Sequence, residues 1–190
     1  DGLGEHVAAC LAGVFTLEQA LALVAHRATL LETTTPDPRG LLPSSAHEAY
    51  TAIVRRVPLQ VPQIPFVSCV TGTWITAAEA TDPGYWSQHL NPPGARDAAL
   101  QTLLRAHDGV LLIVGSGPAL HAGVMQHPDC DARRAALVIP TIRDQRDRED
   151  TQDDEAFLLT TLGRLWLAGV AIDWHAFAAA ERRCRVPLPT

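Results

Sequence analysis

Side chains that could bind a metal or form disulfide bonds are widely spaced in this sequence. The cysteines form no CxxC pair, and the histidines show no HxxxH or HxH spacing that would place two imidazoles on one helix or strand face. We therefore predict no metal, no cofactor and no disulfide framework, and we expect free thiols at the cysteines. These are Cys10, Cys69, Cys130 and Cys184.

The charged side chains do not form the basic surface that nucleic acid requires. The net charge is −6, and the 15 basic residues, all of them arginine, are scattered or paired with acids. No apolar run approaches the ~20 residues that a membrane span needs, and no signal peptide opens the chain. We expect a cytoplasmic protein that binds neither nucleic acid nor membranes.

The length and the composition fit one ordinary domain. A chain of 190 residues with 47% hydrophobic content can bury a sizeable core. Residues 110–114 are all aliphatic and are followed by a glycine, which is typical of a strand buried on both faces of a parallel sheet. Residues 66–75, interrupted by Gly72, and residues 137–142 are predicted to form further strands. Because strands alternate with helices, the sequence predicts an α/β fold with a short parallel sheet flanked by helices.

Helix signals precede and follow these strands. Small apolar residues indicate a helix over residues 3–14 that ends at Gly13. Thr16 and Gln19 form a capping box for a second helix that extends to about residue 32. The apolar face of that helix is predicted to consist of Leu17, Ala20, Leu21, Val24 and Leu31.

Further helices and connections follow along the chain. Ser45 is the expected N-cap of a helix over residues 46–57, and Asp82 with Pro83 is expected to start a short helix through residues 85–90. Other helices are predicted over residues 95–107, 119–126 and 157–167. Residues 33–45 are predicted to be a linker and residues 143–154 a solvated charged connection. Residues 58–65, 173–174 and 186–189 are expected to be extended.

Four collinear segments of the sequence are informative when taken together. They are residues 3–15 (LGEHVAACLAGVF), 57–72 (VPLQVPQIPFVSCVTG) with Tyr85 and Trp86, 112–120 (LIVGSGPAL), and 165–174 (LWLAGVAIDW) with 186–190 (VPLPT). Together they resemble the acyltransferase domains of modular type I polyketide synthases. The first is similar to the stretch after the nucleophile elbow of that family, the third to its strand and glycine turn near the active site, and the last to the linker that returns toward the ketosynthase.

The resemblance implies a truncated acyltransferase-like domain over residues 1–165, with an α/β-hydrolase-like core, and a post-acyltransferase linker over residues 166–190. Between the first helices the family inserts a small ferredoxin-like subdomain, which forms one wall of the substrate cleft. Here the linker over residues 33–45 stands in its place and is far shorter than the ~50 residues of an independently folded unit. The strands and the oxyanion-hole loop that precede the elbow in the family are also missing from this sequence.

The nucleophile is the main departure from the family. Its members carry Gly-His-Ser-x-Gly at the elbow, which presents the serine for attack on an acyl thioester. In this sequence Asp1 falls at the histidine position and Gly2 at the serine position. Glycine has no side chain that could form the acyl-enzyme. The resemblance therefore implies a domain with no catalytic residue, in which even serine at position 2 would not restore a competent site.

Two other residues occupy functional positions of the family. Arg27 stands where relatives keep an arginine that binds the free carboxylate of malonyl or methylmalonyl groups, a task suited to a bidentate guanidinium. His47 stands at the position of the general base, in the altered context Ser44-Ser45-Ala46-His47-Glu48. Both are expected to be vestigial, because no nucleophile accompanies them.

These departures favour a pseudoenzyme within a polyketide synthase of secondary metabolism. It would act as a spacer or a docking platform between a ketosynthase and neighbouring domains. Its partners would be a ketosynthase, an acyl carrier protein or a trans-acting acyltransferase, the last because another enzyme would have to load the extender unit.

Two alternatives remain open from the sequence. An acyltransferase or thioester hydrolase could use a different nucleophile, and the candidates are Ser44, Ser45, Ser116 and Cys69, none of which lies in an elbow pattern. The chain could also be a trimmed piece of an active domain, which its start without Met allows.

Overall fold

A computed structural model describes residues 2–91, 94–115, 118–143 and 153–179. The chain divides into two compact units, residues 1–107 and 108–190. Each unit is described by itself. The expected boundary between a truncated domain and a linker at residue 165 stays a prediction.

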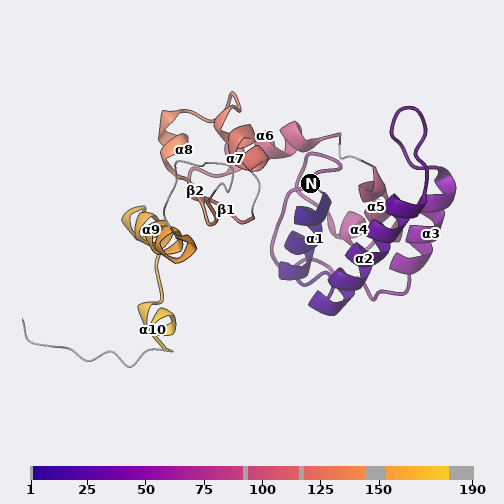
Figure 1. Cartoon of the computed structure of the whole chain (residues 1–190), viewed down its shortest axis with the longest axis horizontal. Coiled ribbons are helices and arrows are strands. Elements are labelled where there is room, and N and C mark those ends of the chain that lie inside the picture. Colours follow the sequence, from indigo (N-terminus) through magenta and orange to yellow (C-terminus); the bar gives the residue numbers. More distant parts are fainter. Residues whose placement is uncertain (1, 92–93, 116–117, 144–152, 180–190) are drawn as a thin grey trace, which may run out of the picture. The chain divides into compact units, whose positions relative to one another are not determined.

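The first unit is built mainly from helices (Figure 1). Its elements are α1 (Gly2–Leu11), α2 (Leu17–Thr33), α3 (Ser44–Val54), α4 (Ala77–Ala80), α5 (Pro83–Ser87), the 3₁₀ helix η1 (Gln88–Leu90) and α6 (Arg96–Ala106). Residues 34–43 form the loop between α2 and α3.

Local capping signals fix several of these helices where the sequence predicts them. Thr16 accepts a hydrogen bond from the backbone N–H of Gln19, whose side chain accepts one from the N–H of Thr16, so the capping box is confirmed. Asp82 caps α5, and Pro83 stands in its first turn, where the missing N–H costs nothing.

Two helix predictions need correction. The face of α2 that packs inside carries Ala20 and Leu23, whereas Leu17, Leu21 and Leu31 are exposed. Of the predicted face, Ala20 is buried and Val24 is half-buried, so the apolar periodicity indicated only part of the buried face, because aliphatic residues occur around most of this helix. Helix α3 begins at Ser44 with Pro43 at the N-cap, so Ser45 lies inside the first turn and does not cap it.

Residues 66–75 do not form the predicted strand. They make a tight reversal with one antiparallel bridge, between Val67 and Trp74. Gly72 has a φ of 77°, a left-handed conformation that favours glycine and turns the chain after a few residues. The β-branched composition of the segment indicated a strand, but the turn leaves no length for one.

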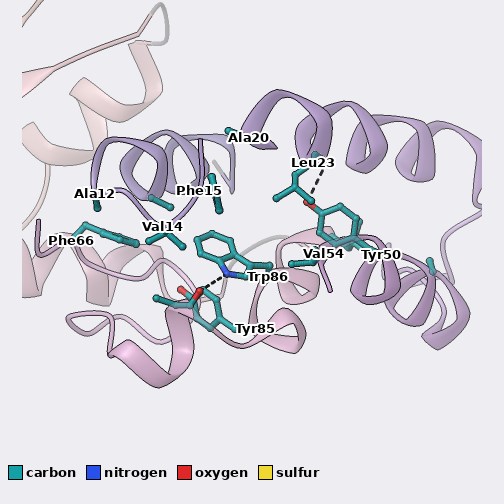
Figure 2. Packing of buried hydrophobic residues seen from close by; sticks show 14 of the residues in the cluster. Ala12, Val14, Phe15, Ala20, Leu23, Tyr50, Val54, Phe66, Tyr85 and Trp86 are labelled. Atoms are coloured by element: carbon teal, nitrogen blue, oxygen red, sulfur yellow. Dashed lines mark hydrogen bonds between the residues drawn. The ribbon is translucent and has the colours of Figure 1, made fainter. Parts of the chain in front are cut away.

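Trp86 lies at the centre of the core of the first unit, fully buried (Figure 2). Its indole meets the Phe15 ring edge-on at a centroid distance of 5.2 Å, and its Nε1 donates to the carbonyl of Ala80 at 3.0 Å. Helices α1, α2, α3 and α5 supply most of the surrounding side chains. They include Ala9, Ala20, Leu23, Tyr50, Val54 and Tyr85.

The second unit holds the short parallel sheet that the sequence predicts. Strand β1 (Leu111–Ile113) pairs with β2 (Val138–Pro140) in parallel, with Leu111 opposite Val138. The helices α7 (Pro118–Met125) and α8 (Ala132–Ala136) connect the two strands, and α9 (Asp154–Leu167) and α10 (Trp174–Phe177) follow. The α/β class is thereby confirmed, in a helix-rich form with two paired strands among the described residues.

One prediction near the C-terminal end of the second unit was wrong. Residues 173–174 were expected to be extended, but Asp173 caps α10, which starts at Trp174, through a hydrogen bond from the Ala176 N–H. Ser116, most of the charged run at residues 143–154 and the extended segment at 186–189 lie outside the described residues. Within the described ranges, no helix is long and apolar enough to cross a membrane.

Candidate functional site

The turn at residues 88–91 is the point on which three helices of the first unit converge. Helix α1 contacts it through Glu5, α2 through Arg27 and α3 through His47. Gly2 is the first residue of α1, one turn before Glu5. The structure therefore arranges the helices that carry Gly2, Arg27 and His47 around one short segment.

Arg27 is bound to the backbone of this turn. Its Nε donates to the carbonyl oxygen of His89 at 2.9 Å, in a half-buried position. A guanidinium fixed in this way holds η1 against α2, because a charged donor satisfies a backbone acceptor that the short helix leaves unpaired. The residue expected to bind a substrate carboxylate thus has a structural contact.

His47 is held by the side chain of Asn91. The Nδ2 of Asn91 lies 3.0 Å from the Nε2 of His47, and the Oδ1 of Asn91 accepts the backbone N–H of Leu42 at 3.0 Å. The backbone donor identifies the oxygen end of the amide, so the NH₂ end faces the imidazole. Because an amide NH₂ can only donate, the Nε2 of His47 is unprotonated and the ring proton is on Nδ1.

This contact occupies the nitrogen through which His47 could accept a proton. A general base needs a free lone pair within reach of the group that it deprotonates. The Nε2 lone pair of His47 already accepts from Asn91, and the same amide is fixed at its other end by Leu42. The arrangement holds the ring in place but does not prepare it for proton abstraction.

Glu5 is a fully buried carboxylate at the first turn of α1. Its Oε2 accepts the backbone N–H of Cys69 at 2.8 Å, and its Oε1 accepts the hydroxyl of Tyr85. The Nε2 of His89 lies 3.6 Å from Oε1. One side chain therefore joins α1 to the 66–75 reversal, to α5 and to η1.

The hydroxyls next to Glu5 form a directed chain. Tyr85 donates its single proton to Glu5, so the contact between Tyr85 and Ser68 requires Ser68 to donate to the tyrosine oxygen. The Oγ of Ser68 in turn accepts the backbone N–H groups of Val70 and Thr71 at 3.0 Å each. The network satisfies the buried carboxylate and fixes the tight reversal at residues 66–75.

The surroundings of Glu5 and Tyr85 shift the pKa values of both side chains. Burial would raise the pKa of the Glu5 carboxyl, but His89, the Tyr85 hydroxyl and the Cys69 N–H together hold that pKa below its ordinary value. Burial and the hydrogen bond to Glu5 raise the pKa of Tyr85. At neutral pH the cluster therefore contains an ionised Glu5 and a protonated Tyr85.

A second buried pair lies between α1 and α3. The Tyr50 hydroxyl donates to the carbonyl of Leu23 at 3.3 Å, so its oxygen accepts from the Nε2 of His6, also at 3.3 Å. Burial raises the pKa of Tyr50 to about 12. His6 and Tyr50 are thus structural polar groups that connect three helices.

A cavity of about 380 Å³ lies beside this region, under the loop between α2 and α3. Its lining residues include Ser44 and Asn91, and also Arg39, whose guanidinium donates two hydrogen bonds to Asp37, at 2.9 and 3.0 Å. The loop stands where the linker over residues 33–45 is predicted. The guanidinium of Arg39 in this loop is thus paired with a neighbouring carboxylate, but its side chain is 80% exposed, so the ion pair contributes little to stability.

The alternative nucleophiles are not activated within the described residues. Burial, and then the charge of Glu5, raise the pKa of the Cys69 thiol above its ordinary value, which disfavours the reactive thiolate. Ser44 and Ser45 are exposed on the first turn of α3. The described residues contain no cluster of His, Cys, Asp and Glu that could hold a metal, and Cys10, Cys69 and Cys130 are free.

The sequence did not reveal the buried polar cluster. Glu5, Ser68, Tyr85 and His89 come from segments far apart in the chain, and no spacing connects them. One local signal was present, since Glu5 is the only carboxylate in a helix of mostly small and apolar residues. A lone acid in such a helix indicates a buried partner that comes from elsewhere in the fold.

Comparisons with known proteins point to one family. No protein-family model matches the chain. A phenolphthiocerol/phthiocerol polyketide synthase polypeptide of Mycobacterium tuberculosis is 30% identical over 138 residues, which are 73% of this chain and 9% of that polypeptide. The matched part of the chain therefore spans less than a tenth of the length of this relative.

Solved structures show the same relationship. The acyltransferase domain of ZmaA superimposes with a TM-score of 0.84 at 26% identity, over 98% of this chain and 57% of that one. The acyltransferase domain of SpnD, solved in complex with 2-(pent-4-yn-1-yl)malonyl, has a TM-score of 0.74 at 25% identity, over 88% of this chain and 55% of that one. In sequence and fold, the chain is therefore similar to the acyltransferase domains of polyketide synthases, over a little more than half the length of the two solved domains.

Proposed function

We propose that this chain is a catalytically inactive acyltransferase-like module of a modular polyketide synthase, which acts as a spacer or a docking platform between a ketosynthase and neighbouring domains. The observation that carries the proposal is the glycine at residue 2, which has no side chain and which the family resemblance assigns to the nucleophile position. Acyl transfer in two steps requires a covalent acyl-enzyme, and glycine cannot form one.

The contacts of the other two family positions support the same conclusion. His47 accepts from Asn91 through the nitrogen that a general base would use, and Arg27 donates to the backbone of η1. Both side chains therefore make hydrogen bonds that stabilise the fold in the absence of a substrate. A fold that keeps these contacts after loss of the nucleophile retains its stability and its shape.

The outer surface of α1 supports a docking role. Leu3, Val7 and Leu11 follow one another at helical spacing on this helix and are 45%, 58% and 74% exposed. In this proposal, a neighbouring domain of the same synthase covers this apolar stripe. The expected partners are a ketosynthase, an acyl carrier protein or a trans-acting acyltransferase of the same synthase, in a cytoplasmic assembly.

Covalent labelling tests the inactivity. The chain is incubated with malonyl- and methylmalonyl-coenzyme A and its intact mass is measured, with a Gly2→Ser variant treated in parallel. We expect no acyl adduct on either protein, because the general base is occupied in both. An adduct on the unmodified chain at stoichiometric level would contradict the proposal.

An adduct would also identify the alternative enzyme. Peptide mapping would place it on one of the candidates Ser44, Ser45, Ser116 or Cys69, of which Ser44 lines the cavity next to Asn91. Replacement of the labelled residue by alanine would abolish the adduct. Such a result would favour an acyltransferase or hydrolase with a non-standard nucleophile. An adduct that appears only on Gly2→Ser would show that the rest of the site is still competent.

A further inference from the structure

The segment between α6 and β1 contains an Asp–Gly pair, Asp108–Gly109, at the start of the second unit. Both residues are exposed and lie outside helices and strands, and the side chain of Asp108 is 75% accessible to solvent. The sequence contains one other Asp–Gly pair, Asp1–Gly2, but Asp1 lies outside the described residues. Asp108–Gly109 is therefore the pair whose surroundings the structure shows.

The peptide nitrogen of Gly109 is accessible. Glycine has no Cβ that would shield its nitrogen, and a Cβ placed on Gly109 would have no atom of another segment within 4 Å. Among the described residues, the N–H of Gly109 forms no hydrogen bond. Because this backbone is neither crowded nor hydrogen-bonded, it can rotate until the nitrogen meets the carboxyl group of Asp108.

An aspartate followed by such a nitrogen can form a cyclic imide. The Gly109 nitrogen loses its proton and bonds to the side-chain carbon Cγ of Asp108, and one carboxyl oxygen leaves as water. Water then adds to the ring. Addition at Cγ restores aspartate, whereas addition at the main-chain carbonyl carbon breaks the bond from that carbon to the nitrogen. The product is isoaspartate, in which the chain runs through Cγ and the α-carboxylate is free. The water that was lost is regained, so no other reactant is needed.

Arg134 restrains the carboxyl group of Asp108. Its Nη2 donates to the Oδ1 of Asp108 at 2.8 Å, and its Nη1 donates to the carbonyl of Asp129, also at 2.8 Å. A carboxylate that accepts this bond is ionised, and an ionised carboxylate does not release an oxygen as water. An ion pair with so exposed a carboxylate is weak and opens often, so Arg134 slows the reaction without preventing it.

We propose that Asp108–Gly109 is a site of isoaspartate formation in the folded protein, and that the ion pair with Arg134 slows the conversion. The conversion adds one methylene group to the main chain just before β1. The first residue of β1, Leu111, donates its N–H to the carbonyl of Leu137 at 3.0 Å. The modification therefore alters the entry to the sheet, and it does not depend on whether the chain transfers acyl groups.

Ageing of the folded chain tests the proposal. The protein is kept at neutral pH and physiological temperature, and samples are digested with trypsin, which releases residues 106–133 as one peptide. Electron-transfer fragmentation locates isoaspartate in this peptide, and a sample taken at zero time gives the background. We expect conversion at Asp108 to be at least about tenfold faster than at Asp129 and Asp131, which precede residues with a Cβ. A form of the peptide that lacks one water should appear before the product.

Gly109→Ala is the matched variant. The φ of Gly109 is not left-handed and a Cβ there meets no atom, so the variant should be as stable to denaturant as the unmodified chain. The added methyl group shields the nitrogen, and conversion at Asp108 is expected to slow at least about tenfold. The proposal would be overturned by equal rates in the two proteins, or by no isoaspartate at residue 108 of the unmodified chain above the zero-time background.

Two arginine variants test the restraint. Arg134→Gln removes the ion pair, and conversion at Asp108 is expected to rise about two- to fivefold. Arg133→Gln removes the neighbouring charge on α8, which forms no ion pair among the described residues, and should leave the rate unchanged. Both are measured at a temperature where their circular dichroism matches that of the unmodified chain. Equal rates in the two variants, or a lower rate in Arg134→Gln, would contradict a restraint by Arg134.

Discussion

The Nδ2 of Asn91 lies 3.0 Å from the Nε2 of His47 and donates to it. The backbone N–H of Leu42 holds the other end of the amide, so the contact fixes both the orientation of the asparagine and the tautomer of the histidine. His47, which the family resemblance assigns to the general-base position, therefore accepts a hydrogen bond within the fold.

Asn91→Asp should reverse the tautomer of His47. A carboxylate at this position still accepts the N–H of Leu42, but it can no longer donate to the imidazole and would draw the ring proton to Nε2. Nitrogen-15 chemical shifts of the ring distinguish the two tautomers. We expect the Nδ1–H form in the unmodified chain and the Nε2–H or charged form in the variant. A protonated Nε2 in the unmodified chain would contradict the assigned contact.

Glu5→Gln should remove a pH dependence of stability. The pKa of Glu5 is lowered in the folded state, so its carboxylate stabilises the fold above the unfolded pKa of about 4.3, and this contribution is lost as the pH falls through the folded pKa. Denaturant unfolding at neutral pH should show a loss of about 1–3 kcal/mol in the variant. The difference between the two proteins should shrink as the pH is lowered from about 5 to about 3.

Glu48→Gln is the control for this measurement. Glu48 is an exposed carboxylate on α3, and its replacement should leave the unfolding curve unchanged over the same pH range. Parallel pH profiles for the unmodified chain and Glu5→Gln would argue against a stabilising, ionised Glu5.

The hydrogen bond of Arg27 predicts that even a conservative substitution at this position lowers the stability of the fold. Arg27→Lys keeps the charge but lacks the Nε that donates to the carbonyl of His89 at 2.9 Å. We expect a loss of about 1–2 kcal/mol in the free energy of unfolding. Arg55→Lys, at an exposed position after α3, should cost nothing measurable. Equal stability of the two variants would mean that Arg27 does not hold η1.

Alanine substitutions at Gly72 and Gly40 should separate the cost of backbone strain from the cost of a steric clash. Both have a left-handed φ, 77° and 79°, but a Cβ at Gly72 would lie 2.6 Å from the Cβ of Ala98, whereas the position of a Cβ at Gly40 is open. Gly40→Ala should cost about 1–2 kcal/mol from strain alone. Gly72→Ala should cost about 1–3 kcal/mol more, because α6 must move. Thermal or denaturant unfolding of both variants measures the difference, and equal costs would contradict the close contact with α6.

The elements that the sequence predicted best are those with local signals. The capping box at Thr16, the Asp82–Pro83 start of α5 and the aliphatic run around β1 depend on residues close together in the chain. The resemblance to acyltransferase domains was also readable from short collinear segments, and the homologues and the superposition support it.

What the sequence could not predict depends on contacts between distant segments. The buried face of α2 is decided by which helices pack against it, so Leu23 is inside while Leu21 is exposed. The partners of Glu5 and His47 come from the turns around residues 68–69 and 89–91, and no spacing rule connects them. Only the folded arrangement shows that the Nε2 of His47 already has a partner, the amide of Asn91.

Transfer of an acyl group to a carrier protein tests the central claim most directly. The chain is mixed with malonyl-coenzyme A and a holo acyl carrier protein, and the malonylated carrier is quantified by mass spectrometry against a sample without the chain. We predict the same slow background in both samples, because Gly2 offers no nucleophile. Malonylated carrier that increases in proportion to the concentration of the chain would show that the module is an active acyltransferase.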